Sequence, residues 1–279
     1  MIGLRATRTM FLAATLLCAP AHAAEQSAVR EMMVEAAIVA QFEDFGERFR
    51  SQLLRTAPAQ SDIPGEFVGE FAEIGGRVMN GERFLDDLEV ALAELLTAEE
   101  VSAISEFYHT PLGRKVGQAE TAGARVEAEA EMEAQRTEIL ARLKENPERL
   151  ALARRADEVL LMSELTATMT TSMMRALVVG GLQSGPRGAD ADTVAMVEQQ
   201  VAALHAPLVE RFREDVLLFF GWIYRDLSGE ELAAYVDFLE SEVARSVYAG
   251  FFVAVSDLMN VRAGRIGEEF AAVMEQKRT

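Results

Sequence analysis

Apolar residues recur along this chain at steps of three and four, and this spacing is the strongest constraint on its fold. Such a spacing places apolar side chains on one face of an α-helix. Three clear stripes lie within residues 34–53, 197–223 and 252–273, while alternating β-branched runs bounded by turns are nearly absent. The sequence therefore predicts an all-α protein with seven to nine helices and essentially no sheet.

Four breaks divide the helical pattern. Residues 57–65 (APAQSDIPG) and 180–188 (GGLQSGPRG) have the composition of a loop and a linker. Asn146-Pro147 ends a long run, because the residue before proline avoids the α conformation. Pro207 lies inside a helical pattern, so a kink or break is expected near His205. We expect two similar helical-bundle halves, at 24–147 and 148–279.

Composition excludes several classes of protein. There are 45 Asp and Glu against 27 Lys and Arg, and the net charge of −18 disfavours binding to the phosphates of nucleic acid. The single cysteine allows neither an internal disulfide nor a thiolate zinc site. The apolar stretches 216–224 and 243–259 are too short or too charged to span a bilayer, so we expect buried core helices.

Residues 1–23 have the pattern of a secretory signal peptide. Arg5 and Arg8 precede the apolar run MFLAATLL, and Ala21-His22-Ala23 supplies small residues for a signal peptidase. Cleavage after Ala23 would leave a chain without cysteine, which suits the oxidising bacterial periplasm. A lipoprotein signal using Cys18 and an uncleaved anchor are the two alternatives.

Two segments of the chain resemble each other. Residues 96–116 and 227–247 align without gaps at an offset of 131 and agree at seven of 21 positions. Both begin with a capping box, in which a hydroxyl accepts from a backbone N–H and a glutamate reaches back to the cap. These residues form a predicted structural motif: Thr97 with Glu100 and Phe107 in the first copy, Ser228 with Glu231 and Phe238 in the second.

The first copy, LTAEEVSAISEFYHTPLGRKV, resembles the signature of the domain of unknown function 2059, a helical module of exported bacterial proteins. The matching residues are Thr97, Glu99, Glu100, Phe107, Tyr108, Thr110, Pro111, Gly113 and Lys115. The resemblance implies export and an all-α fold, but no activity. The second copy has Glu242 and Ala244 in place of Pro111 and Gly113, so we expect its turn to be lost and its two helices to merge.

The corner YHTPLGRK is the most distinctive candidate site. Tyr108, His109, Arg114 and Lys115 are candidate ligands for an anion at a helix start. A structural interpretation is also available: Thr110 caps a helix, Pro111 takes the first helical position and Gly113 permits close packing. This second interpretation is the stronger one.

Sites for metals, cofactors and catalysis are not predicted. After cleavage only His109 and His205 remain, fewer histidines than a zinc site usually takes. Met162, Met169 and Met173 share a helical face, which suits an adaptable core better than a copper(I) site. The acidic stretch 127–133 lies on a helix and should be solvated, since calcium needs a wrapping loop.

These patterns favour a non-enzymatic exported protein that binds a protein partner or an apolar small ligand between its helices. Two other classes stay open. One is an enzyme whose carboxylates come together only in the fold. The other is a structural or assembly protein of the cell envelope, which would expose a large apolar patch. The sequence does not specify the ligand, the partner or the oligomeric state.

Overall fold

The described residues of the computed structural model, 23–60, 65–183 and 190–277, form helices and a single isolated bridge between Ala23 and Thr97. The predicted all-α fold is confirmed. The helices of the first part of the chain are α1 (Gln26–Glu35), α2 (Ile38–Phe42), α3 (Phe45–Gln60), α4 (Gly65–Val78), α5 (Gly81–Leu95), α6 (Ala98–Tyr108), α7 (Pro111–Gly123), α8 (Val126–Ala134) and α9 (Arg136–Glu145). Those of the second part are α10 (Pro147–Leu160), α11 (Met162–Gln183), α12 (Ala191–Ala203), α13 (His205–Ile223), α14 (Gly229–Leu239) and α15 (Glu242–Gln276).

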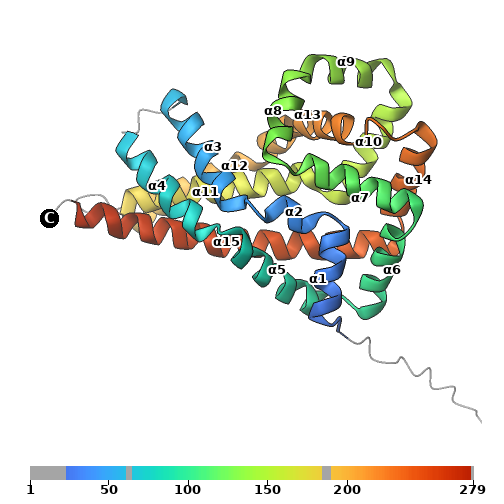
Figure 1. Ribbon diagram of the computed structural model, residues 1–279. Coiled ribbons are helices and arrows are strands. Elements are labelled where there is room, and N and C mark those ends of the chain that lie inside the picture. Colours follow the sequence, from blue (N-terminus) through green and yellow to red (C-terminus); the bar gives the residue numbers. More distant parts are fainter. Residues whose placement is uncertain (1–22, 61–64, 184–189, 278–279) are drawn as a thin grey trace, which may run out of the picture.

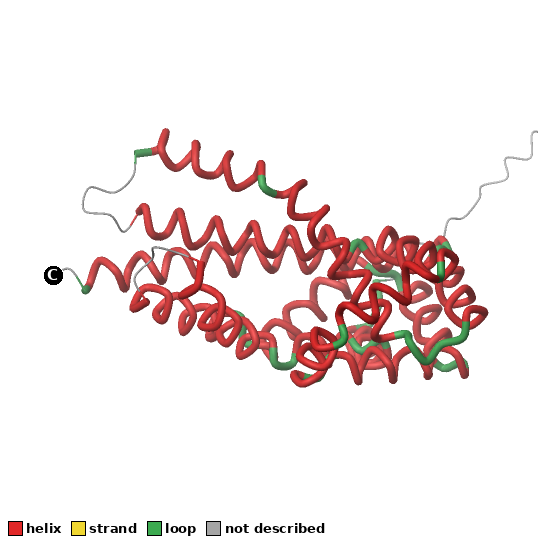
Figure 2. The backbone as a smooth tube through the Cα atoms, turned by 90° about the horizontal axis from the view of Figure 1, so that it is seen from above, coloured by secondary structure: helices red, strands yellow, loops and turns green. Residues whose placement is uncertain are grey.

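The helices form two regions, which we call the head and the arm (Figures 1 and 2). The head contains α1, α2, α5 to α10, α13, α14 and the start of α15. The arm is an extension in which α3 packs on α4, α4 on α15, α15 on α11, and α11 on α12. The 35-residue helix α15 runs through both regions and ties the arm to the head.

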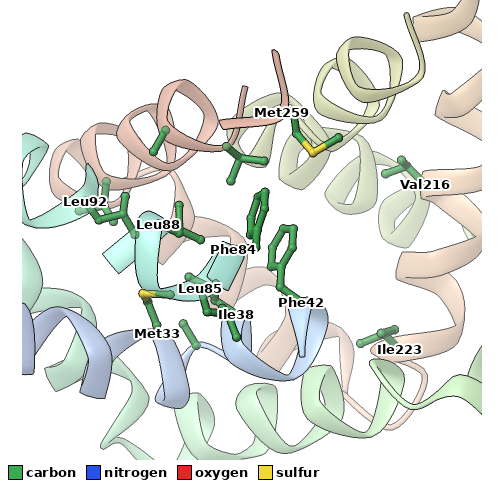
Figure 3. Packing of buried hydrophobic residues seen from close by; sticks show 14 of the residues in the cluster. Met33, Ile38, Phe42, Phe84, Leu85, Leu88, Leu92, Val216, Ile223 and Met259 are labelled. Atoms are coloured by element: carbon green, nitrogen blue, oxygen red, sulfur yellow. The ribbon is translucent and has the colours of Figure 1, made fainter. Parts of the chain in front are cut away.

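A single hydrophobic core joins side chains from both halves of the sequence (Figure 3). Phe42 stacks on Phe84 with ring centroids 4.8 Å apart, and the guanidinium of Arg262 lies 5.2 Å from the Phe84 ring. Arg262 also donates to the carbonyl oxygens of Val78 and Arg83. Helix α15 of the second half thus packs directly against α4, α5 and α6 of the first. The division into units 24–147 and 148–279 stays a prediction.

Both breaks predicted from proline are confirmed. Helix α9 ends at Glu145, and the side chain of Asn146 caps α10 by accepting from the Arg149 N–H at 3.0 Å. Helices α12 and α13 are separated at Leu204, three residues before Pro207. The two long apolar stretches are core segments of α13 and α15, as predicted. None of the described helices combines the length and the apolarity needed to cross a membrane.

The predicted stripe within residues 34–53 is not one continuous helix. Ala37 adopts a left-handed conformation with φ of 55°, which separates α1 from α2, and Val34 is 56% exposed. A further break follows Phe42, where the carbonyl oxygens of Phe42 and Glu43 abut Gly81 so closely that a Cβ there would lie 2.1–2.3 Å away. Such breaks make the helices more numerous than the seven to nine predicted.

Two predicted irregular segments are partly helical. Helix α3 continues to Gln60, four residues into the predicted loop, and α11 continues through Gly180 to Gln183. Residues 61–64 and 184–188 of these segments lie outside the described residues, as do residues 1–22 of the predicted signal segment 1–23.

Glycine at position 180 allows α11 and α15 to cross closely. A Cβ on Gly180 would lie 2.7 Å from the carbonyl oxygen of Gly267, whereas real Cβ contacts are not that short. Packing at this crossing therefore requires glycine, although glycine inside a helix costs up to about 1 kcal/mol relative to alanine.

We expect Gly180→Ala to lower the unfolding free energy by about 1–3 kcal/mol, because the two backbones must separate. Gly264→Ala is the matched control, since a Cβ at Gly264 on α15 meets no neighbour within 4 Å. It should raise stability by about 0.5–1 kcal/mol through helix propensity. Urea unfolding measures both changes. Equal stabilisation by the two variants would contradict a tight crossing.

Candidate functional site

Two helical hairpins with the same local design meet at one end of the head: α6–α7 and α14–α15 (Figure 1). Each opens with the predicted capping box. The Glu100 N–H donates to Thr97 Oγ1 at 3.2 Å, and Glu100 Oε2 accepts from the Thr97 N–H at 2.8 Å. The corresponding distances between Ser228 and Glu231 are 3.1 and 2.8 Å. Both boxes therefore form as the sequence predicted.

The second hairpin keeps its turn, so the prediction of a merged helix is wrong. Helix α14 ends at Leu239, and Ser241 caps α15 by accepting from the Ala244 N–H at 3.2 Å. Thr110 caps α7 in the same way, accepting from the Gly113 N–H at 2.9 Å. A serine cap is sufficient to start a helix. The second turn therefore forms without the proline of the first, whereas Gly113 is needed in the first turn, because a Cβ there would lie 2.0 Å from the Phe107 carbonyl oxygen.

The hairpins contact each other reciprocally through their capping glutamates. Lys115 Nζ of the first hairpin lies 2.7 Å from Glu231 Oε2 of the second. Ser246 Oγ of the second hairpin donates to Glu100 Oε1 of the first at 2.5 Å. The hydrogen bond from Lys115 lowers the pKa of Glu231. At Glu100, burial raises the pKa of the carboxyl, but hydrogen bonds from Ser246 and Thr97 lower it, and the net shift is downward.

The four predicted anion ligands point to different partners. Tyr108 is buried, and His109 Nε2 lies 2.5 Å from Glu35 Oε1. Arg114 donates to the backbone oxygen of His109, while Lys115 pairs with Glu231. The structure does not bring these side chains together around one point. The predicted anion site stays a prediction.

The buried polar centre of the head is Glu120, a residue that the sequence analysis did not select. It lies on α7 and is 7% exposed. All four tyrosines of the chain surround it. Tyr224 and Tyr235 donate to Glu120 Oε1 at 2.5 and 2.8 Å.

The second carboxyl oxygen has weaker contacts. Tyr108 Oη lies 3.4 Å from Glu120 Oε2, and the same hydroxyl lies 3.4 Å from Tyr248 Oη. The tyrosines come from α6, α14, α15 and the residue that follows α13. One carboxyl group therefore connects four chain segments to α7, and we call these five residues the tyrosine–glutamate cluster.

Burial dominates the electrostatics of the cluster. It raises the pKa of Glu120 from 4.5 to about 7, although the hydrogen bonds from Tyr224, Tyr235 and Tyr108 act in the opposite direction. Burial and the nearby carboxyl also raise the pKa values of Tyr108, Tyr224 and Tyr235 well above 10. The phenols thus stay protonated, and Glu120 is the member of the cluster that titrates near neutral pH.

A local sequence signal for Glu120 does exist. Leu112, Val116 and Ala119 define the apolar face of α7, and Glu120 follows Val116 by four residues on that face. A glutamate in the middle of an apolar stripe is unusual, because charged residues are rarely buried without a partner. Its tyrosine partners are up to 128 residues away in sequence, so only the fold identifies them.

The cluster offers a ligand little room. A hollow that borders the cluster at Tyr248 has a volume of about 10 Å³ and an apolar lining that includes Ile104 and Phe251. A larger hollow of about 530 Å³ is open and polar. It lies on the opposite side of α13 from Val216 and Phe220 and is lined by Arg136, Glu210, Arg211, Glu214 and Asp215.

Metal-binding side chains do not gather in the described part of the chain: no group of three His, Cys, Asp or Glu residues there is placed to hold an ion. His205 Nε2 lies 3.2 Å from Thr168 Oγ1. Met162, Met169 and Met173 pack partly buried against the core. The acidic side chains at 127, 129, 131 and 133 are exposed, as predicted.

One comparison with known proteins concerns the first hairpin. Residues 82–140 match the sequence model of a family described as "Uncharacterized protein conserved in bacteria (DUF2059)". The predicted resemblance to this family is thereby confirmed. The DUF2059 match contains α6, α7 and both Tyr108 and Glu120, but not the other three tyrosines. No curated protein and no solved structure matches the chain.

Replacing Glu120 by glutamine should remove one component of the pH dependence of stability. Below pH 4.5 the carboxyl is protonated in the folded and the unfolded chain. Between pH 4.5 and about 7 only the unfolded chain ionises, which favours unfolding, and above about pH 7 the penalty is constant. A pKa rise of this size corresponds to about 3 kcal/mol.

We therefore expect the unfolding free energy of the wild type, relative to Glu120→Gln, to fall by about 3 kcal/mol between pH 4.5 and 8. Urea unfolding at several pH values measures this difference. Glu127→Gln, at an exposed position on α8, is the control and should follow the wild type. A constant difference between wild type and Glu120→Gln would show that Glu120 has an ordinary pKa in the fold.

Proposed function

We propose that this protein is an exported, non-enzymatic helical module that binds a partner through the apolar surface of α12. The observation that carries the proposal is the poor burial of this helix. Eight of its 13 residues are Val, Ala or Met, at positions 191, 194–197 and 201–203, yet among its residues only Val201 is buried. An apolar helix that buries only one of its own residues is a typical partner-binding element.

The surroundings of α12 support this proposal. Met196 is 55% exposed, and Leu204 at the end of the helix is 40% exposed. Val178 on the neighbouring helix α11 is 39% exposed. Helix α12 contacts α11 and α13 and lies at the end of the arm's helix order, away from α3. Exposed apolar area of this kind is stabilised when a partner covers it.

The geometry gives less support to a carboxylate-based enzyme. Catalytic acids act on substrates within hydrogen-bond reach. The buried carboxyl of Glu120 has its hydrogen-bond partners inside the core, and the adjoining hollow has a volume of about 10 Å³. The alternative is a structural role in assembly of the cell envelope. In that case the same surface of α12 would bind a second copy of the chain or a structural component of the envelope.

Photocrosslinking tests the proposed surface. We expect p-benzoylphenylalanine at position 196 to give a discrete adduct in cells, whose partner mass spectrometry identifies, and the same probe at exposed Glu127 to give none. Met196→Glu should abolish co-purification of that partner while changing the unfolding free energy by less than about 0.5 kcal/mol. An adduct of two copies would favour assembly. Absence of any adduct at position 196 would contradict the proposal.

The contacts of Ala24 are compatible with export and with cleavage after Ala23. Ala24 is the first described residue with a buried side chain, and its N–H donates to the Leu96 carbonyl at 3.1 Å. Cleavage after Ala23 would leave this nitrogen at the new amino terminus, still able to donate to the same oxygen. A periplasmic location of the mature protein is thus compatible with complete folding after removal of residues 1–23.

We expect the protein purified from a periplasm to begin at Ala24, as measured by N-terminal sequencing and intact mass. Ala23→Arg should leave the precursor unprocessed, because the peptidase requires a small residue there. Processing at Cys18 with an added lipid, or a full-length chain in the cytoplasm, would overturn the proposed export route.

We infer further that α14 and the start of α15 are a second copy of α6–α7. Equivalent residues at an offset of 131 make equivalent bonds: Arg114 and Arg245 each donate to the backbone oxygen five residues earlier. Phe107 and Phe238 stack with centroids 3.7 Å apart and planes 6° apart. A two-fold axis between equivalent side chains produces such a parallel pair, and the reciprocal contacts of the capping glutamates follow the same symmetry.

A further inference from the structure

We propose that the tyrosine–glutamate cluster is a proton-controlled latch between the two hairpins, closed when the Glu120 carboxyl is protonated and loosened when it loses its proton. The placement of the cluster is the first argument. Glu120 belongs to α7 of the first hairpin, while Tyr235 and Tyr248 belong to α14 and α15 of the second. The cluster is thus one of the contacts that hold the two hairpins together, beside the capping-glutamate contacts and the Phe107–Phe238 stack.

The contacts of the carboxyl leave Oε2 as the oxygen that can carry a proton. Glu120 Oε1 accepts two short hydrogen bonds from Tyr224 and Tyr235, at 2.5 and 2.8 Å. Glu120 Oε2 has only the 3.4 Å contact with Tyr108. A proton on Oε2 can be donated to Tyr108, whose own hydroxyl hydrogen then points to Tyr248 at 3.4 Å. In the protonated cluster, Oε1 thus keeps its two phenol donors and the hydroxyl on Oε2 faces Tyr108 Oη.

The ionised cluster lacks a counter-charge. The cations of the packed elements have other partners: Lys115 of α7 pairs with Glu231, and Arg149 of α10 donates to the backbone oxygens of Tyr224 and Leu227. Arg125, which precedes α8, donates to the backbone oxygen of Ala122.

Three further basic side chains near these helices have partners other than Glu120. His109 after α6 binds the carboxylate of Glu35 from α1. Arg225 after α13 lies over the ring of Trp222, with its guanidinium carbon 4.5 Å from the ring centroid. Arg245 of α15 donates to the backbone oxygen of Glu240. A negative charge on Glu120 is thus stabilised by phenols alone, and hydration becomes its best alternative. Entry of water requires the hairpins to loosen.

The fluorescence of Trp222 can be used to follow this movement. It is the single tryptophan of the chain and is 4% exposed. Its ring lies 3.7 Å from the position that a Cβ on Gly123 would take, one helical turn after Glu120 on α7. Displacement of α7 should therefore change the fluorescence of Trp222.

The experiment is a fluorescence titration of the mature protein from pH 5.5 to 8.5. We expect the wild type to show one transition with its midpoint near pH 7, and Glu120→Gln to show none. Tyr224→Phe should move the midpoint upward, because it removes a hydrogen bond that stabilises the ionised carboxyl. His109→Gln and Glu127→Gln should keep the wild-type transition.

Hydrogen exchange at pH 6 and 8, corrected for intrinsic rates, locates the change. Amides of α7 and α14 should lose protection at pH 8 in the wild type by about tenfold or more, while α11 in the arm keeps its protection. The proposal is overturned if the wild type shows no transition, if Glu120→Gln retains it, or if His109→Gln abolishes it. Should Glu120→Gln fail to fold by circular dichroism, an unmoved midpoint in Tyr224→Phe overturns the proposal instead.

Discussion

Burial of one carboxyl group among four phenols determines how the head of this protein is assembled. Apolar side chains alone would let α7 slide against its neighbours, because burial of apolar surface has little directionality. The two short bonds to Glu120 Oε1 and the contact at Oε2 fix both the rotation and the axial position of α7. Every chain segment that supplies a tyrosine is oriented by the same group.

This arrangement favours a unique structure over maximal stability. A neutral, well-packed side chain at position 120 would avoid the desolvation that raises the pKa of the carboxyl to about 7. Buried polar groups nevertheless specify one packing arrangement, since any other arrangement leaves them without partners. The same property makes the cluster sensitive to a proton, because the number of donors and acceptors that must be satisfied changes with ionisation.

The proposed repeat has a tyrosine–glutamate contact at only one of its two equivalent positions. At an offset of 131, Glu120 corresponds to Phe251 and Tyr235 to Ile104. Phe251 and Ile104 both border the small apolar hollow next to Tyr248. The two-fold relation therefore pairs a polar contact region with an apolar one. We infer that the hairpins retained their shared caps and reciprocal glutamate contacts while their interior surfaces diverged, which leaves the polar region as the element that distinguishes the two copies.

Local residues predicted the helices well and the site poorly, for one physical reason. Helix caps, proline breaks and apolar stripes depend on residues within about four positions, so Thr97 with Glu100 and Asn146 with Pro147 were identifiable directly. The left-handed conformation of Ala37, with φ of 55°, has no such local signal.

The tyrosine–glutamate cluster depends on contacts between residues far apart in the sequence, and this is why the sequence analysis did not identify it. Tyr108 was selected as a candidate for another reason, its place beside the predicted helix start at Pro111. A carboxylate on the apolar face of α7 and a chain with only four tyrosines are separate facts in the sequence. They become one site only when the pairing of the hairpins is known. Searching apolar helical faces for isolated carboxylates, and then for phenols on the facing helices, would apply the same logic before a structure is available.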